Sequence, residues 1–78
     1  MKVELRLYAS LSIYMPKIDR NALMVDVVEG ITIKELLDQF EVPLDLIKMI
    51  FLNGVHARGD EILNEGDRVG VFPPVAGG

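Results

Sequence analysis

The residues of this sequence whose types and spacing are best suited to chemistry stand together in the run VFPPVAGG, residues 71–78. Gly77 and Gly78 carry no Cβ, so they can pass through a channel that is too narrow for other residues. They also leave the carboxylate of Gly78 open to attack once it has been activated, for example by adenylation. Pro73 and Pro74 fix φ and remove two backbone donors, so pairing with a sheet must end there. The spacing predicts a tail that points away from a folded body, with Gly78 as its reacting residue.

The predicted tail covers residues 74–78, in which Val75 and Ala76 separate the prolines from the glycines. Its full extension reaches on the order of 17 Å, at about 3.3 to 3.6 Å for each residue. That reach is enough to enter the active site of another protein. We therefore expect a folded domain of residues 1–73 and a flexible C-terminal tail of residues 74–78.

The overall composition limits the possible classes of function. A chain of 78 residues forms a single domain. Its 8 Lys and Arg against 12 Asp and Glu give a net charge of -4, which disfavours nucleic acid and anionic membranes as partners. The sequence has no apolar run near the roughly 20 residues of a membrane span and no signal-peptide pattern, so we expect the cytoplasm. The absence of cysteine excludes disulfides, thiolate metal sites and a thiol nucleophile.

The other polar residues give weaker signals for catalysis or metal binding. His56 has no nucleophile or carboxylate at a defined spacing around it, so we interpret it as a histidine of a surface loop. Asp38, Glu41 and Asp45 are interpreted as solubilising acids near the end of a helix rather than as metal ligands. We therefore expect no metal site, no bound cofactor and no catalytic activity in the chain alone.

Hydrophobic periodicity predicts the first elements that must position the tail. Residues 2–8 alternate with a period of two, as in a strand with one buried face. The valine-rich residues 22–29 predict a second strand, which pairs with the first as a hairpin. Between these strands we expect a short helical turn that breaks at Pro16.

The clearest helix is predicted for residues 32–40. Thr32 can cap this helix, Glu35 can complete a capping box, and the apolar stripe that follows should lie on the sheet. The continuous apolar run of residues 49–52 predicts a strand that is buried on both of its faces.

The last third of the chain alternates between turns and strands. A tight turn is predicted at Asn53-Gly54. The polar residues 58–67 should form a loop with Ile62 and Leu63 tucked beneath it, and residues 68–73 predict the final strand.

This order of elements predicts an α+β domain in which a mixed sheet wraps around one main helix, with a flexible C-terminal Gly-Gly tail. It matches the β-grasp arrangement of ubiquitin-like proteins. Such a body serves as a protein modifier, a regulatory module, an iron–sulfur electron carrier or a sulfur carrier. The lack of cysteine excludes the iron–sulfur class, and the order of elements alone does not choose among the others.

The segment GDRVGVFPPVAGG resembles the C-terminal signature of the small, sulfur-carrying subunit of molybdopterin synthase, in the MoaD/ThiS-like ubiquitin-related family. In that family a strand after a Gly-Asp turn runs into Phe-Pro-Pro and then a short spacer that ends in Gly-Gly. The opening VELRLYASL, the TIKELLDQF helix and the FLNG turn resemble the family more softly, along nearly the whole length. Thiamine-pathway carriers share the fold and the Gly-Gly end but usually lack the Pro-Pro, so the resemblance favours molybdopterin synthase. The matching residues are Gly66, Asp67, Val69, Val71, Phe72, Pro73, Pro74, Gly77 and Gly78.

The resemblance implies a reaction cycle at Gly78. A ubiquitin-activating-like adenylyltransferase uses ATP to adenylate the carboxylate, and sulfur transfer converts it to a thiocarboxylate. The tail then enters the large subunit of the synthase, where sulfur passes to cyclic pyranopterin monophosphate to form the dithiolene that holds molybdenum or tungsten. The carrier itself would bind no cofactor.

Strand alternation also predicts a contact surface for these partners beside the tail. Phe72 should point opposite to Val69 and Val71, onto the outer face of the sheet, unless the strand twists and lets it cap the core. Tyr8 and Met24 are on the outward phase of their strands and could complete an apolar patch with Phe72.

Other functions would use the same tail or none of it. The chain could carry sulfur for thiamine or for tRNA thiolation. It could instead be a ubiquitin-like modifier, with Gly78 joined to a lysine of a target by an amide bond. A third class is an interaction module that does not need Gly77 and Gly78.

Overall fold

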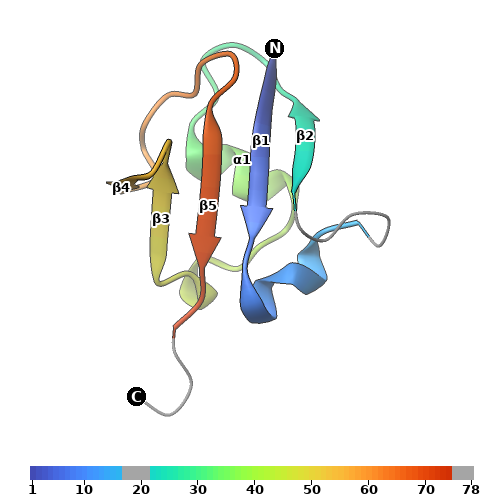
Figure 1. Cartoon of the computed structure of the whole chain (residues 1–78), viewed down its shortest axis with the longest axis vertical. Helices are drawn as coiled ribbons and strands as arrows, with labels where there is room; N and C mark the ends of the chain where they lie inside the picture. The colour runs from blue at the N-terminus through green and yellow to red at the C-terminus, as the bar shows by residue number, and fades with distance from the viewer. Residues whose placement is uncertain (17–21, 75–78) are drawn as a thin grey trace.

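The computed structural model describes residues 1–16 and 22–74, whose elements form one sheet and one main helix (Figure 1). The strands are β1 (Lys2–Leu7), β2 (Leu23–Asp26), β3 (Met49–Leu52), β4 (Val55–Ala57) and β5 (Arg68–Phe72). The helix α1 spans Ile33–Gln39. A 3-10 helix, η1 (Ala9–Tyr14), follows β1, and a second, η2 (Leu44–Leu46), precedes β3.

The sheet is mixed, and its strand order is β2-β1-β5-β3-β4. The central strands β1 and β5 run parallel, while β2 pairs antiparallel with β1 and β3 pairs antiparallel with β5 and β4. Helix α1 lies against one face of this sheet, and no helix of the described chain covers the face turned to the viewer in Figure 1. The predicted α+β architecture and the predicted hairpin of the first two strands are confirmed.

The core lies between the inner face of the sheet and α1. The inward residues of β1 and β5 and the apolar stripe of α1 have almost no exposed surface, and burial of each such side chain contributes about 1.5 to 3 kcal/mol. These residues are Val3, Leu5, Leu7, Val69, Val71, Ile33, Leu36 and Leu37. The period-two pattern of β1 is therefore confirmed.

The start of α1 is closed by the predicted capping box. The backbone N–H of Glu35 donates to the Thr32 hydroxyl over 3.2 Å, and the Thr32 N–H donates to the Glu35 carboxylate over 2.9 Å. Two backbone donors that the helix cannot satisfy internally thus find acceptors. The helix ends after Gln39, close to the predicted boundary.

The turn at Asn53-Gly54 is also confirmed. Both residues have positive φ, 53° and 82°, as a two-residue turn between antiparallel strands requires. The Asn53 side chain reinforces this turn, because its Oδ1 accepts the N–H of Arg68 over 2.9 Å and its Nδ2 donates to Asp67 over 3.0 Å.

Two predictions of burial are wrong. Strand β3 is not buried on both faces: Ile50 faces the core, but Met49 is exposed and Phe51 half-buried on the uncovered face. Ile62 is not tucked beneath its loop, since 60% of it is exposed. A bridge between Thr32 and Ile62 gives this short segment strand alternation, which turns Leu63 into the core and Ile62 away from it.

Candidate functional site

The last strand, β5, stops at the end of the sheet where the tail was predicted to begin. The Val71 carbonyl accepts the N–H of Tyr8 over 3.0 Å, and the Phe72 carbonyl accepts the N–H of Lys48 over 2.8 Å. Strand β5 ends there, because Pro73 and Pro74 have no N–H to donate. The strand is one residue shorter than predicted, and the prediction that pairing stops at the prolines is confirmed.

An aromatic cluster lies beside this exit. The rings of Tyr8 and Phe72 stack with centroids 4.2 Å apart and planes 3° from parallel, and Phe51 meets Phe72 edge-on at 5.7 Å. Such pairs contribute about 0.5 to 1.5 kcal/mol beyond the burial of their area. Phe72 and Tyr8 remain 37% and 36% exposed, so both rings can still be contacted from outside. The outward orientation predicted for Phe72 is therefore confirmed.

Register explains why these rings meet. Arg6 is opposite Gly70 in the parallel pair β1 and β5, so the next outward positions of the two strands are Tyr8 and Phe72. Gly70 leaves room for the Tyr8 ring, since a Cβ at this position would lie 3.3 Å from Cε2 of Tyr8. The glycine thus becomes part of the floor of a groove next to the stacked rings.

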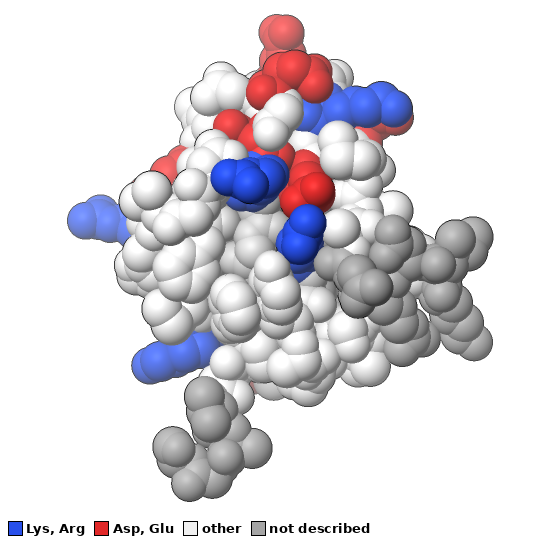
Figure 2. All heavy atoms as spheres, in the orientation of Figure 1, with Lys and Arg blue, Asp and Glu red and all other residues white. Residues whose placement is uncertain are grey.

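The groove has a volume of about 380 Å³ and combines aromatic and cationic residues. Its lining includes Arg6, Tyr8, Phe51, Arg68, Gly70 and Phe72. Figure 2 shows that acidic side chains gather at the upper end of this face, whereas the lower half, over the C-terminal ends of β1 and β5, is mostly uncharged. A partner that binds here would cover the aromatic rings and, at the charged end of the groove, Glu4 beside Arg6.

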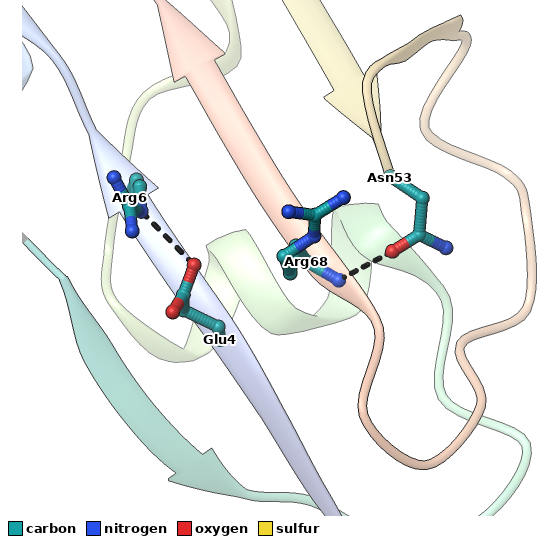
Figure 3. A network of polar contacts seen from close by, with 4 residues as sticks. All are labelled: Glu4, Arg6, Asn53 and Arg68. Carbon is teal, nitrogen blue, oxygen red and sulfur yellow. Dashed lines mark hydrogen bonds and ion pairs between the residues drawn. The ribbon is translucent and has the colours of Figure 1, made fainter.

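Two guanidinium groups border the groove on its charged side (Figure 3). Arg6 donates to Glu4 over 2.9 Å, and this hydrogen bond, with the charge of the carboxylate, raises the pKa of Arg6 above its ordinary value. The backbone of Arg68 is held by Asn53, while its guanidinium makes no ion pair within the described chain. Arg68 is therefore available to a carboxylate of a partner.

Met24 does not belong to the aromatic cluster. It lies on the same outer face and is 56% exposed, but its register partner is Glu4, so the Glu4–Arg6 ion pair separates it from Tyr8. Two residues that the sequence analysis did not include are closer to the site: Met49 is opposite Phe72, and Phe51 is opposite Gly70. The run MIFL, residues 49–52, contains the signal for them: if Ile50 points inward, strand alternation places Met49 and Phe51 on the outer face.

Other sequence candidates for chemistry are dispersed over the surface. His56 is exposed and makes an edge-on contact with Phe51 at 5.9 Å, and Asp38, Glu41 and Asp45 are exposed as well. Within residues 1–16 and 22–74, no three His, Cys, Asp or Glu side chains are grouped so that they could hold a metal ion. In the same part of the chain, no helix is long and apolar enough to cross a membrane.

The end of the predicted tail lies outside the described residues. This applies to Val75, Ala76, Gly77 and Gly78, so the role of Gly78 and the boundary between domain and tail stay predictions. The predicted contacts of Phe72, Tyr8 and Met24 with partners stay predictions as well.

The mixed sheet, the single main helix and the strand that ends at a Pro-Pro pair define a small ubiquitin-like protein of the β-grasp class. The chain matches the model of the ThiS family over residues 15–78, and it belongs to the ThiS family. No curated protein sequence matches it significantly.

Solved structures support the same fold. SAMP1 from Haloferax volcanii is 26% identical, with a TM-score of 0.77 and complete coverage of both chains. A putative molybdopterin converting factor, subunit 1, from Pyrococcus furiosus is 24% identical, with a TM-score of 0.72 over 95% of this chain and 98% of that chain. A complex of subunits 1 and 2 of molybdopterin-converting factor from Helicobacter pylori contains a chain that is 24% identical, with a TM-score of 0.64 and complete coverage of both chains.

Family and fold together limit the function to two related classes. The chain is a ThiS/MoaD-like sulfur carrier or a ubiquitin-like modifier, and small proteins of this type are generally not catalysts themselves.

Proposed function

We propose that this chain is a sulfur carrier and the small subunit of a molybdopterin synthase, with Gly78 as its reacting residue. One observation carries the proposal: strand β5 ends at Pro73-Pro74 directly beside an exposed aromatic groove. A partner that holds the groove would have the residues after Pro74 within reach of its active site. Membership of the ThiS family and the Phe-Pro-Pro to Gly-Gly pattern support the same function.

In the proposed cycle the carboxylate of Gly78 first attacks the α-phosphorus of ATP in an activating enzyme. An acyl-adenylate forms and pyrophosphate leaves. A donor then supplies sulfur at the oxidation level of sulfide, which displaces AMP and leaves a thiocarboxylate. This step suits a carrier without cysteine, because the chain has no thiol of its own to attack the activated terminus.

The thiocarboxylate sulfur then acts as a nucleophile on the pyranopterin precursor, cyclic pyranopterin monophosphate. The carbon–sulfur bond to the precursor forms as a carbon–oxygen bond of the precursor breaks and its oxygen leaves, and water then hydrolyses the thioester to the carrier and restores its carboxylate. Two such transfers are needed for the dithiolene, so each product requires two charged carriers. Gly77 would let the tail pass a narrow channel, and Val75 and Ala76 would span the distance from the prolines.

Two partners are expected at the aromatic groove. One is a ubiquitin-activating-like adenylyltransferase, and the other is a large synthase subunit, which the two-subunit complex from Helicobacter pylori leads us to expect. Both must place the same tail in an active site, so we expect them to contact Phe72 and Tyr8 in turn. The carrier binds no cofactor in this proposal, and ATP is used by the activating enzyme in the cytoplasm.

The test is the intact mass of the protein after incubation with ATP, a sulfur donor and the activating enzyme of its host. A variant without Gly78 is the matched control. Replacement of one terminal oxygen by sulfur, seen only in the full-length chain, supports the carrier. No change in mass with an enzyme that is active on another carrier contradicts it. Sulfur transfer to the pyranopterin precursor in the presence of the large subunit then separates this pathway from thiamine and tRNA thiolation.

A ubiquitin-like modifier is the second candidate, because SAMP1 is similar to this chain over its full length. The activated Gly78 would then form an amide bond with a lysine of a target. An adduct in cells that survives thiol reagents and disappears when Gly78 is deleted would favour this function over sulfur transfer.

A further inference from the structure

A second hollow lies away from the aromatic groove, where η2 and β3 meet the start of α1 and the residue after β4. It has a volume of about 270 Å³, and its lining includes Lys34, Leu44, Ile47, Lys48 and Arg58. We call it the cationic hollow. It shares no lining residue with the aromatic groove, so one molecule could bind in the cationic hollow while another binds the aromatic groove.

The charges of this hollow are not balanced within it. Among the described residues its lining contains three cations and no carboxylate, in a chain whose net charge is -4. Lys34, Lys48 and Arg58 make no ion pair in the described part of the chain. Acids lie outside this lining: Glu35 and Asp38 line the neighbouring hollow, Asp45 follows Leu44 in η2, and the Glu61 carboxylate accepts the N–H of Arg58.

The backbone holds one of these cations in place. A Cβ on Gly59 would lie 2.9 Å from Cγ and 3.0 Å from Cε of Lys34, so the lysine stem rests against the glycine. The Lys34 N–H also donates to the Gly59 carbonyl over 2.9 Å. The loop beneath is ordered by Glu61, whose carboxylate accepts the N–H groups of Arg58 and Gly59 over 2.9 Å and 2.7 Å. The lysine therefore loses less conformational freedom on binding than a free surface lysine would.

The hollow also offers apolar surface between its cations. Leu44 is 59% exposed, and Ile47 beside it is half-buried. A free phosphate group would leave this aliphatic surface uncovered, and the net negative charge of the chain opposes nucleic acid. Carboxylates on both sides of an aliphatic side chain would match both the charge and the apolar surface.

We propose that the cationic hollow binds an acidic amphipathic segment of a partner protein. An aliphatic side chain of that segment packs on Leu44 and Ile47, and flanking carboxylates meet Lys34, Lys48 and Arg58. The proposal does not depend on sulfur transfer, because neither the tail nor the aromatic groove takes part in it.

The test is a titration of the isotope-labelled full chain with the acetylated peptide Glu-Leu-Glu-Glu-Leu-Glu, followed by amide chemical shifts. We expect saturable shifts at Lys34, Leu44, Lys48 and Arg58, which weaken when salt is raised from about 50 mM to about 500 mM. The double variant Lys34→Gln/Arg58→Gln should bind about two- to fivefold more weakly for each charge removed. The single variant Lys2→Gln removes a cation that lines neither hollow and should bind like the original chain, whereas Lys34→Gln, which has the same net charge as Lys2→Gln, should bind more weakly.

Control ligands separate this proposal from simpler ones. The peptide Gln-Leu-Gln-Gln-Leu-Gln and inorganic phosphate should each cause much smaller shifts. The peptide has the aliphatic side chains but no carboxylates, and phosphate has negative charge but no aliphatic side chain. Equal shifts with either of them would overturn the proposal, as would equal weakening in Lys34→Gln and Lys2→Gln. It would also be overturned if no residue of the cationic hollow shifted at millimolar peptide, or if the shifts occurred at Tyr8 and Phe72 instead.

Discussion

Tyr8 and Phe72 lie near opposite ends of the chain, yet their rings stack 4.2 Å apart on the outer face of the sheet. The parallel pairing of β1 with β5 brings them together, and the chain leaves the sheet one residue later at Pro73. The stack therefore joins the strand that opens the fold to the strand that carries the tail. This exposed aromatic pair is the surface at which we propose that partners bind, next to the residues proposed to react.

Phe72→Ala should weaken binding to the two proposed partners more than it weakens the fold. Aromatic anchors of an interface cost about 2 kcal/mol or more when truncated, whereas the stacking lost within the chain is worth about 0.5 to 1.5 kcal/mol. Calorimetric titration with the large synthase subunit and with the activating enzyme, beside urea unfolding, measures both effects. Met24→Ala is the matched control, since Met24 is exposed on the same face but outside the aromatic cluster. Equal losses of affinity in the two variants would contradict a specific role of the stack.

Gly59→Ala should destabilise the chain by about 1 to 3 kcal/mol. The φ of Gly59 is +113°, which L side chains rarely adopt, and the new methyl group would also press on Cγ of Lys34 at 2.9 Å. Gly66→Ala is the control, because Gly66 has a φ of +82° but no atom within 4 Å of an added Cβ. Chemical unfolding should show the larger loss for Gly59→Ala, and shortening Lys34 to Ala should recover part of the difference.

Local patterns predicted the elements of this fold better than they predicted its surfaces. The alternation in β1 and the capping box of Thr32 and Glu35 depend on neighbours in sequence, and both are confirmed. The exposure of Met49 and Phe51 depends on which face of the sheet α1 covers, and an apolar run carries no information on that. The stack of Tyr8 on Phe72 depends on the register of two distant strands, which local periodicity does not specify.

The stability that depends on Glu61 should be lost in acid. The hydrogen bonds that its carboxylate accepts from the N–H groups of Arg58 and Gly59 hold the pKa of Glu61 below its usual value. A carboxyl group whose pKa is lowered by folding stabilises the protein above the pKa of the unfolded chain, and this stabilisation disappears as pH falls through the folded pKa. Urea unfolding should therefore show a deficit for Glu61→Gln at neutral pH that shrinks below pH 4.5, the ordinary pKa of this group. The control Glu29→Gln replaces an exposed carboxylate and should cost little stability at neutral pH, and a deficit for Glu61→Gln that is independent of pH would contradict the assignment.

Asn53→Gly and Asn53→Ala should separate the two roles of the turn residue. Glycine accepts the positive φ of 53° but removes the side-chain bonds to the Arg68 N–H and to Asp67, while alanine removes those bonds and adds backbone strain. We expect a loss of about 1 kcal/mol for Asn53→Gly and a further loss of about 1 kcal/mol for Asn53→Ala, measured by urea unfolding. Amide exchange of Arg68 should accelerate in both variants, because Asn53 Oδ1 is its acceptor at the start of β5. If Asn53→Gly is as stable as the original chain and leaves that exchange unchanged, the side-chain bonds do not anchor the strand that leads to the tail.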